Sequence, residues 1–74
     1  MEEIRITQWT NKSVTIIYFE RMTGDFTGEV VIEYDADEKG WWSESFEGMA
    51  WYGSNGRALA VDFVIEWLVC HSDD

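Results

Sequence analysis

Apolar and polar side chains alternate over residues 4–10, and this two-residue period is that of a strand with one buried face. Residues 13–20 follow with many β-branched and aromatic side chains, which favour strands. Asn11 and Lys12 separate the two segments, and Asn tolerates the positive φ of a tight turn. The pattern therefore predicts a β-hairpin with large side chains on both faces. A two-residue turn would pair Ile6 with Ile17, Ile4 with Phe19, Arg5 with Tyr18, and Trp9 with Val14.

A third strand is predicted next. Residues 23–28 contain two glycines and favour a turn. Residues 29–35 then alternate again, so that one set of side chains faces inward and the other faces outward. The inward set comprises Val30, Ile32 and Tyr34, and the outward set comprises Glu29, Val31, Glu33 and Asp35.

The sheet is expected to continue after a polar turn at residues 36–40. Residues 41–46 predict a fourth strand, with Trp41 and Trp42 on opposite faces. Residues 48–53 are either irregular or a short fifth strand.

The last apolar segment predicts a helix that begins after Ser54 or Asn55 and ends near His71. Apolar residues surround most of this helix and leave a narrow polar stripe with Asp62 and Glu66. One sheet face needs an apolar arc of only about 100°, so we expect the remainder to contact a second copy or a partner. The alternative is that the small fold itself surrounds the helix. The row facing the sheet is predicted to be Leu59, Phe63 and Trp67, and the oligomer interface Val61, Ile65 and Val69.

These segments predict one α+β domain over residues 1–74, a four-stranded, mainly antiparallel sheet with one C-terminal helix packed on one face. At this size about 60% of the unfolded surface is buried on folding, so the 5 Trp, 4 Phe and 3 Tyr contribute much of the core. Cys70 is the only cysteine, which excludes an intramolecular disulfide. The chain starts without the basic and apolar regions of a signal peptide, and its apolar stretches are too short to span a bilayer. We expect a cytoplasmic protein.

The net charge bears most directly on function. The chain has 15 acidic residues and only 5 basic ones, which gives a net charge of -10. The chain is also 46% hydrophobic, so it folds rather than forming a disordered acidic tail. A compact body of this charge repels nucleic acid and anionic membranes and attracts basic surfaces. The basic residues are dispersed along the chain and form no stripe for phosphate contacts. We expect a basic, nucleic-acid-processing protein as partner, and direct binding neither to nucleic acid nor to membranes.

The acidic residues concentrate between residues 25 and 47, where Lys39 is the only opposing cation. Carboxylates at every second residue of a strand lie about 6–7 Å apart, which approximates the phosphate spacing along one nucleic-acid strand. Aromatic side chains among them supply anchors for an interface. The alternative is that this charge serves solubility alone. The predicted partner-binding residues are Glu29, Glu33, Asp35, Asp37, Glu38, Glu44, Glu47 and Trp41.

Metal and catalytic motifs are incomplete. Asp35 and Asp37 occupy the first and third positions of an EF-hand-like calcium loop, but Lys39 stands at the fifth position and Phe46 at the twelfth. His71 follows the lone cysteine directly, whereas a Cys-His nucleophile needs two side chains that converge across a pocket. We therefore expect no metal, no cofactor and no enzymatic activity.

The segment VVIEYDADEKGWWSESFEGMAWYGSNGRALAVDFVIEWLV contains a strand, an Asp-rich turn, a second strand ending near an aromatic residue, a Gly-containing loop and a long helix. In this order residues 29–69 resemble the HicB antitoxin family. The resemblance implies a small sheet with a helix on one face, and neutralisation of a small basic ribonuclease toxin.

The size, charge and single-domain form are also similar to those of phage-encoded inhibitors that imitate DNA, of the anti-CRISPR and anti-restriction type. This likeness implies occupation of a basic nucleic-acid channel on a host defence complex. The leading hypothesis is thus an acidic inhibitor of the nucleic-acid-mimic type. The alternatives are a HicB-like antitoxin and a homodimeric adaptor or structural module.

Overall fold

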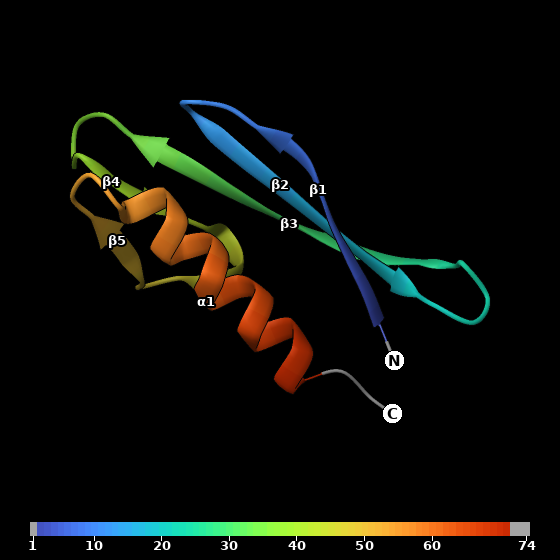
Figure 1. Ribbon diagram of the computed structural model, residues 1–74. Helices are drawn as coiled ribbons and strands as arrows, with labels where there is room; N and C mark the ends of the chain where they lie inside the picture. Colours follow the sequence, from blue (N-terminus) through green and yellow to red (C-terminus); the bar gives the residue numbers. More distant parts are fainter. Residues whose placement is uncertain (1, 72–74) are drawn as a thin grey trace.

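The sheet follows the order of the chain. In the computed structural model, which describes residues 2–71, five antiparallel strands lie in the order β1-β2-β3-β4-β5, with one α-helix against the sheet (Figure 1). The α+β class and the C-terminal helix are confirmed, whereas the predicted number of four strands is wrong because a short fifth strand adds to the edge. The elements are β1 (Glu2–Trp9), β2 (Ser13–Glu20), β3 (Phe26–Asp35), β4 (Gly40–Trp42), the 3-10 helix η1 (Glu44–Phe46), β5 (Ala50–Tyr52) and α1 (Gly56–Cys70).

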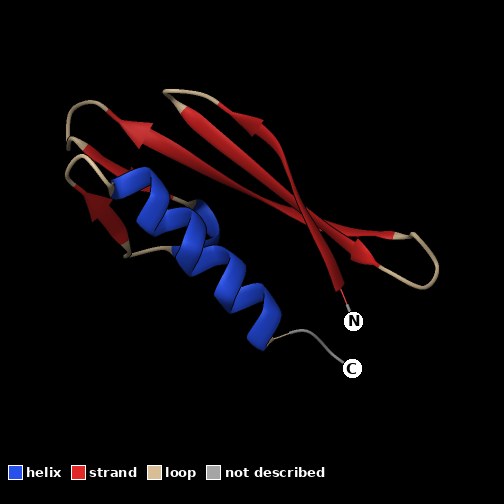
Figure 2. Ribbon diagram, viewed as in Figure 1, coloured by secondary structure: helices blue, strands red, loops and turns tan. Residues whose placement is uncertain are grey.

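The molecule is elongated, with Cα extents of 41 × 20 × 18 Å. Figure 2 shows α1 beside the end of the sheet that contains β4 and β5, while the loop between β2 and β3 lies at the opposite end. That loop occupies residues 21–25, so the predicted turn at residues 23–28 is placed too late and includes the first three residues of β3. The chain re-enters the sheet at Phe26 because Phe26 pairs with Phe19 of β2.

The first hairpin contains a β-bulge between Ile6 and Gln8 that the sequence pattern did not predict. Trp9 pairs with Val14 as expected, but beyond the bulge every predicted partner is wrong by one residue. The bulge keeps the apolar sets of both strands on the same face, because a slip of one residue would turn one set outward. The pairs are Ile6 with Ile16, Arg5 with Ile17, and Ile4 with Tyr18.

The predicted fourth strand at residues 41–46 is also wrong, because β4 ends at Trp42 and η1 follows. Phe46 leaves the sheet and packs edge-to-face against Phe63 and Trp67 of α1, with ring centroids 5.3 Å apart in both pairs. Burial of these rings against the helix outweighs continued strand pairing. Tyr34, predicted to face inward, is partly exposed and packs against Trp41 at 5.4 Å.

The core lies between α1 and the face of the sheet that carries Val14, Ile16, Val30 and Ile32. The predicted sheet-facing row of the helix is wrong, since Leu59 is half exposed and Trp67 is partly exposed. The helix residues that face the sheet are each about one position later in the sequence than the predicted row. The residues that α1 buries are Gly56, Ala60, Val61, Val64 and Leu68.

The start of α1 is held close to the sheet. The helix begins after Asn55 as predicted, and Gly56 lies so near β5 that a Cβ would stand 2.6 Å from the carbonyl oxygen of Trp51. Arg57 donates a hydrogen bond to the carbonyl of Thr10 at 2.7 Å, and its guanidinium lies 4.7 Å from the Trp9 ring centroid. These contacts hold the start of α1 against β5 and against the turn between β1 and β2. In the described part of the chain no helix has the length and apolar character to cross a membrane.

Candidate functional site

The face of the sheet opposite α1 is the candidate functional site. Side chains that pair across neighbouring strands share a face, so the register of β3, β4 and β5 identifies its members. Trp41 and Trp51 pair on the helix side, which places their neighbours Trp42 and Tyr52 on the opposite side. We call this surface the open face; over β3–β5 it comprises Glu29, Val31, Glu33, Asp35, Trp42, Ala50 and Tyr52.

The predicted row of carboxylates on β3 lies on this face. Glu29 and Glu33 are exposed, and Asp35 is half-buried at the end of the strand. Asp35 also shapes the following turn, because its Oδ1 accepts backbone hydrogen bonds from Asp37 at 2.9 Å and Glu38 at 3.3 Å. Asp37 and Glu38 are exposed in that turn. The two-residue period thus locates the row correctly, but Asp35 combines surface charge with a structural role.

A groove of about 520 Å³ opens at the β4–β5 end of the open face. We call it the acidic groove, because Asp35, Glu38, Glu44 and Glu47 all line it. Its remaining large side chains are Trp42, Met49 and Tyr52, each of them substantially exposed. The fold brings together acidic residues from the β3–β4 turn and from the η1 segment, and places aromatic rings among them.

Trp41 was predicted to be the aromatic residue of the site, and the structure corrects this prediction because the side chain is buried. It is 7% exposed and belongs to the core, with Tyr34 at 5.4 Å and the Arg57 guanidinium at 5.8 Å. Its neighbour Trp42, 39% exposed, is the tryptophan of the acidic groove. Strand alternation separates the two side chains, but only the position of the helix decides which one is buried.

Tyr52 is a groove residue that the sequence analysis missed. It pairs with Gly40, and a Cβ on that glycine would lie 2.6 Å from Tyr52 Cε1 and 2.7 Å from Cδ1. The ring therefore rests on the bare backbone of β4, and the side chain is still 59% exposed. An aromatic residue opposite glycine is a signal only once the strand register is known.

Ser43 is a second groove residue without a signal in the sequence. It is 2% exposed, and its hydroxyl has no hydrogen-bond partner among the residues that the structure describes. Buried hydroxyl groups in folded proteins nearly always have one.

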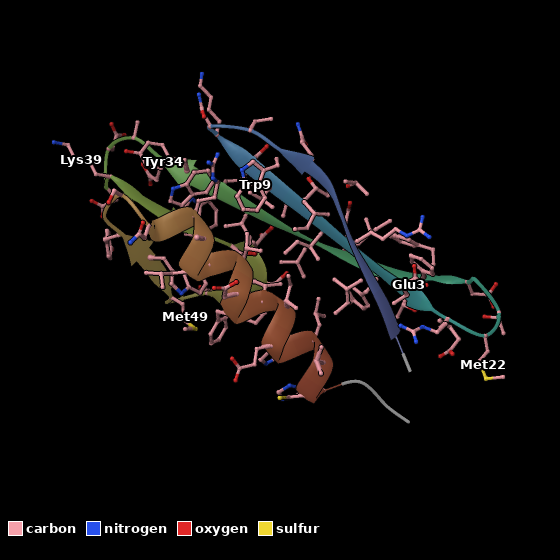
Figure 3. The ribbon with its side chains drawn as sticks, viewed as in Figure 1. Glu3, Trp9, Met22, Tyr34, Lys39 and Met49 are labelled. Carbon is pink, nitrogen blue, oxygen red and sulfur yellow. The ribbon has the colours of Figure 1, made fainter. Side chains whose placement is uncertain are left out.

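The charge of the open face is not compensated locally. Arg5 pairs with Glu3 at 3.1 Å and lies over the Phe19 ring, while Arg57 is on the helix side. Lys39 sits at the tip of the β3–β4 turn and points outward in Figure 3. Within residues 2–71 none of the four carboxylates of the acidic groove forms an ion pair. The surface therefore presents a net negative field to an approaching molecule.

The predicted oligomer interface on α1 does not form a continuous exposed row. Val61 is 5% exposed and belongs to the core, which corrects its assignment to the outer side of the helix. Ile65 is half-buried and packs against the core, and Val69 is exposed. Leu59, expected to face the sheet, is exposed instead.

The lone cysteine and the lone histidine lie at the C-terminal end of α1, as Cys70 and His71. Across residues 2–71, no group of three His, Cys, Asp or Glu side chains is placed to hold a metal ion. His71 Nδ1 is 2.8 Å from the carbonyl oxygen of Trp67, and the two rings stack at 4.2 Å. Cys70 is exposed.

Comparison of this chain with protein-family models, with curated proteins and with solved structures gives no match.

Proposed function

We propose that this protein is a small acidic inhibitor that occupies the basic nucleic-acid-binding surface of a nuclease or defence complex. The open face carries the proposal. It combines carboxylates that form no ion pair within residues 2–71 with exposed aromatic side chains and a groove, on the side of the sheet away from α1. A basic protein surface that normally binds phosphates is complementary to this arrangement.

The mechanism has two physical parts. The net charge of -10 steers the protein toward a basic surface and raises the association rate. Short-range contacts by Trp42 and Tyr52 then slow dissociation, because buried aromatic residues carry most of the energy in many interfaces. The other side of the sheet packs against the core, so the charges are held on a scaffold that is already ordered before binding.

We place this activity in the cytoplasm, that of a bacterial host if the protein is phage-encoded, with no cofactor involved. The partner is a basic nucleic-acid-processing protein. If it proves to be a small ribonuclease toxin, the HicB-like alternative is the correct class.

The test begins with capture of the partner from a host lysate and its identification by mass spectrometry. Association of wild type is then compared with the variant Glu29→Gln/Glu33→Gln/Asp35→Asn, in which Asn can still cap the turn. We expect association to slow roughly 10-fold at low salt, and the partner's nucleic acid to compete with the inhibitor.

A matched control removes the same number of charges elsewhere. Asp25→Asn/Asp62→Asn/Glu66→Gln changes exposed residues of the β2–β3 loop and of α1. This control should keep a near wild-type association rate. Equal slowing in both triple variants would contradict a specific acidic face, and binding that persists alongside nucleic acid would contradict the inhibitor mechanism.

A second candidate is a homodimeric adaptor or structural module. It is favoured by Leu59 and Val69, which are exposed apolar residues on α1. In this case wild type should sediment as a dimer whose stability changes little with salt, and Val69→Asp should shift it toward monomer. A monomer at high concentration would rule this candidate out.

A further inference from the structure

We propose that the free edge of β1 pairs with the same edge of a second copy of this chain, so that two copies form a symmetric antiparallel dimer centred on Ile4. The proposal does not depend on the inhibitor function. Its surface is a strand edge, whereas the homodimeric alternative above uses the exposed side of α1.

The two edges of the sheet differ in length. β5 has three residues, whereas β1 has eight, and no described strand lies on the outer side of β1 (Figure 1). Alternate residues of an edge strand direct unpaired N–H and C=O groups outward, so a long edge is a template for a further strand. Ile6 is on the side of β1 that faces α1, yet it is 44% exposed, because α1 packs mainly against β3, β4 and β5. The β1 edge therefore offers both backbone groups and apolar surface.

The charge distribution favours a second copy at this edge. Residues 2–24 contain three acidic and three basic residues, so the net charge of -10 lies in the rest of the chain. Arg57 adds a further cation near β1, because its guanidinium contacts Trp9 and the carbonyl of Thr10. Two copies that meet through β1 thus keep their acidic regions apart, and at physiological ionic strength charges are screened over about 8 Å.

The strand itself selects one symmetric register. The bulge between Ile6 and Gln8 interrupts the alternation, so the regular part of β1 is residues 2–6. An antiparallel pairing that uses all of these residues in both copies has its two-fold axis at Ile4. Glu3 of each copy then lies opposite Arg5 of the other copy, and Ile4 lies opposite its own counterpart.

Both faces of this register are complementary. Glu3 and Arg5 share the open face, and their side chains are 33% and 64% exposed. Opposite charges directly across two antiparallel strands stabilise the pairing, and like charges destabilise it. An axis at Glu3 or at Arg5 would place two like charges opposite each other. On the other face Ile6 lies diagonally beside the second copy's Ile4, so the exposed part of Ile6 becomes covered.

The dimer would extend the surface that carries the proposed function. Antiparallel neighbours in one sheet are related by a two-fold axis normal to that sheet, so both helices lie on one side and both open faces on the other. The carboxylate rows of the two copies, each with Glu29, Glu33 and Asp35, then belong to one continuous acidic surface.

The first test reverses the charges at positions 3 and 5 and measures association of the full chain by sedimentation equilibrium in about 150 mM KCl. Wild type should form dimers. Glu3→Arg and Arg5→Glu should each weaken dimerisation roughly 5- to 100-fold, because two contacts between opposite charges become two contacts between like charges. The double variant Glu3→Arg/Arg5→Glu should restore dimerisation.

A mixture of the two single variants gives the sharpest result. Neither variant should dimerise well alone, but an equimolar mixture should form a heterodimer, because the strand with two arginines then faces the strand with two glutamates. Each single change removes only an exposed ion pair within its own chain. Circular dichroism and the urea midpoint should therefore change little.

Amide hydrogen exchange locates the contact. Backbone amides of residues 2–6 should gain protection as the protein concentration rises, whereas those of Ala50–Tyr52 at the opposite edge should not. Leu59→Asp changes an exposed apolar residue of α1 and should leave dimerisation unchanged.

Several outcomes would overturn the β1 dimer: a wild type that stays monomeric, a mixture that associates no better than its components, or charge reversals without effect. If Leu59→Asp alone abolishes association, the contact is on α1. If wild type stays monomeric and only the captured partner protects residues 2–6, the edge pairs with a strand of that partner instead. The self-association measurements use this chain alone, so the Glu29/Glu33/Asp35 comparison decides the inhibitor function separately.

Discussion

The contact between Tyr52 and Gly40 makes a prediction in which one substitution has opposite effects in two backgrounds. Gly40→Ala adds a Cβ that would lie 2.6 and 2.7 Å from two ring atoms of Tyr52. The next neighbour is the carbonyl oxygen of Trp51 at 3.5 Å, which is an ordinary van der Waals distance. Among residues 2–71, the tyrosine ring is therefore the only serious obstacle to alanine at this position.

Two opposing terms set the magnitude. Gly40 is the first residue of β4 and pairs with both neighbouring strands. In a strand, alanine is more stable than glycine by about 0.5–1 kcal/mol because it loses less backbone entropy. Overpacking against a well-placed neighbour is unfavourable by about 1–3 kcal/mol. Gly40→Ala should thus lower the free energy of unfolding by about 1 kcal/mol in wild type. In a Tyr52→Ala background the overlap is gone, so the same change should raise the free energy of unfolding by about 0.5–1 kcal/mol.

The assay is equilibrium unfolding in urea of wild type, both single variants and the double variant, followed by tryptophan fluorescence and circular dichroism. The double-mutant cycle then isolates the coupling between positions 40 and 52, expected at about 1–3 kcal/mol. The slopes of the four transitions should agree, which shows that the unfolded state is unchanged. If Gly40→Ala has the same effect in both backgrounds, the Tyr52 ring does not rest on Gly40, and the acidic groove has no fixed aromatic wall.

The other predictions concern the core, the helix start and the partner class. Ile32→Ala should lower the free energy of unfolding by about 2–5 kcal/mol, enough to leave a domain of this size mostly unfolded by circular dichroism. Gly56→Ala should destabilise by about 1–3 kcal/mol despite the better helix propensity of alanine, because the obstacle is a backbone carbonyl; a raised urea midpoint would contradict the close approach. Arg57→Ala should lower the free energy of unfolding by about 1–3 kcal/mol, because the hydrogen bond to Thr10 and the contact with Trp9 are lost. The free energy of unfolding of Arg57→Lys should lie between those of wild type and Arg57→Ala. Finally, gel shifts at low salt should show no binding to DNA or RNA, since such binding is strongest there.

Local periodicity predicted much of the fold. Alternation located β1, β2 and the main part of β3, and the parity of Glu29, Glu33 and Asp35 placed the three on one face. The long apolar segment after Asn55 predicted α1 almost to the residue. These features follow from the period of side chains along a single element and from residues that start a helix, and both are properties of a short stretch of chain.

The tertiary structure alone decided which side of each element is covered. The bulge between Ile6 and Gln8 shifts the hairpin register. Alternation predicts that Trp41 and Trp42 lie on opposite faces of the sheet, but it does not predict which of the two the helix buries. The acidic groove likewise depends on where β5 pairs and where η1 leaves the sheet, so its residues are neighbours only after folding. The physical reason is that the period of side chains along an element depends only on its own residues, whereas burial and proximity depend on which other segment packs against it.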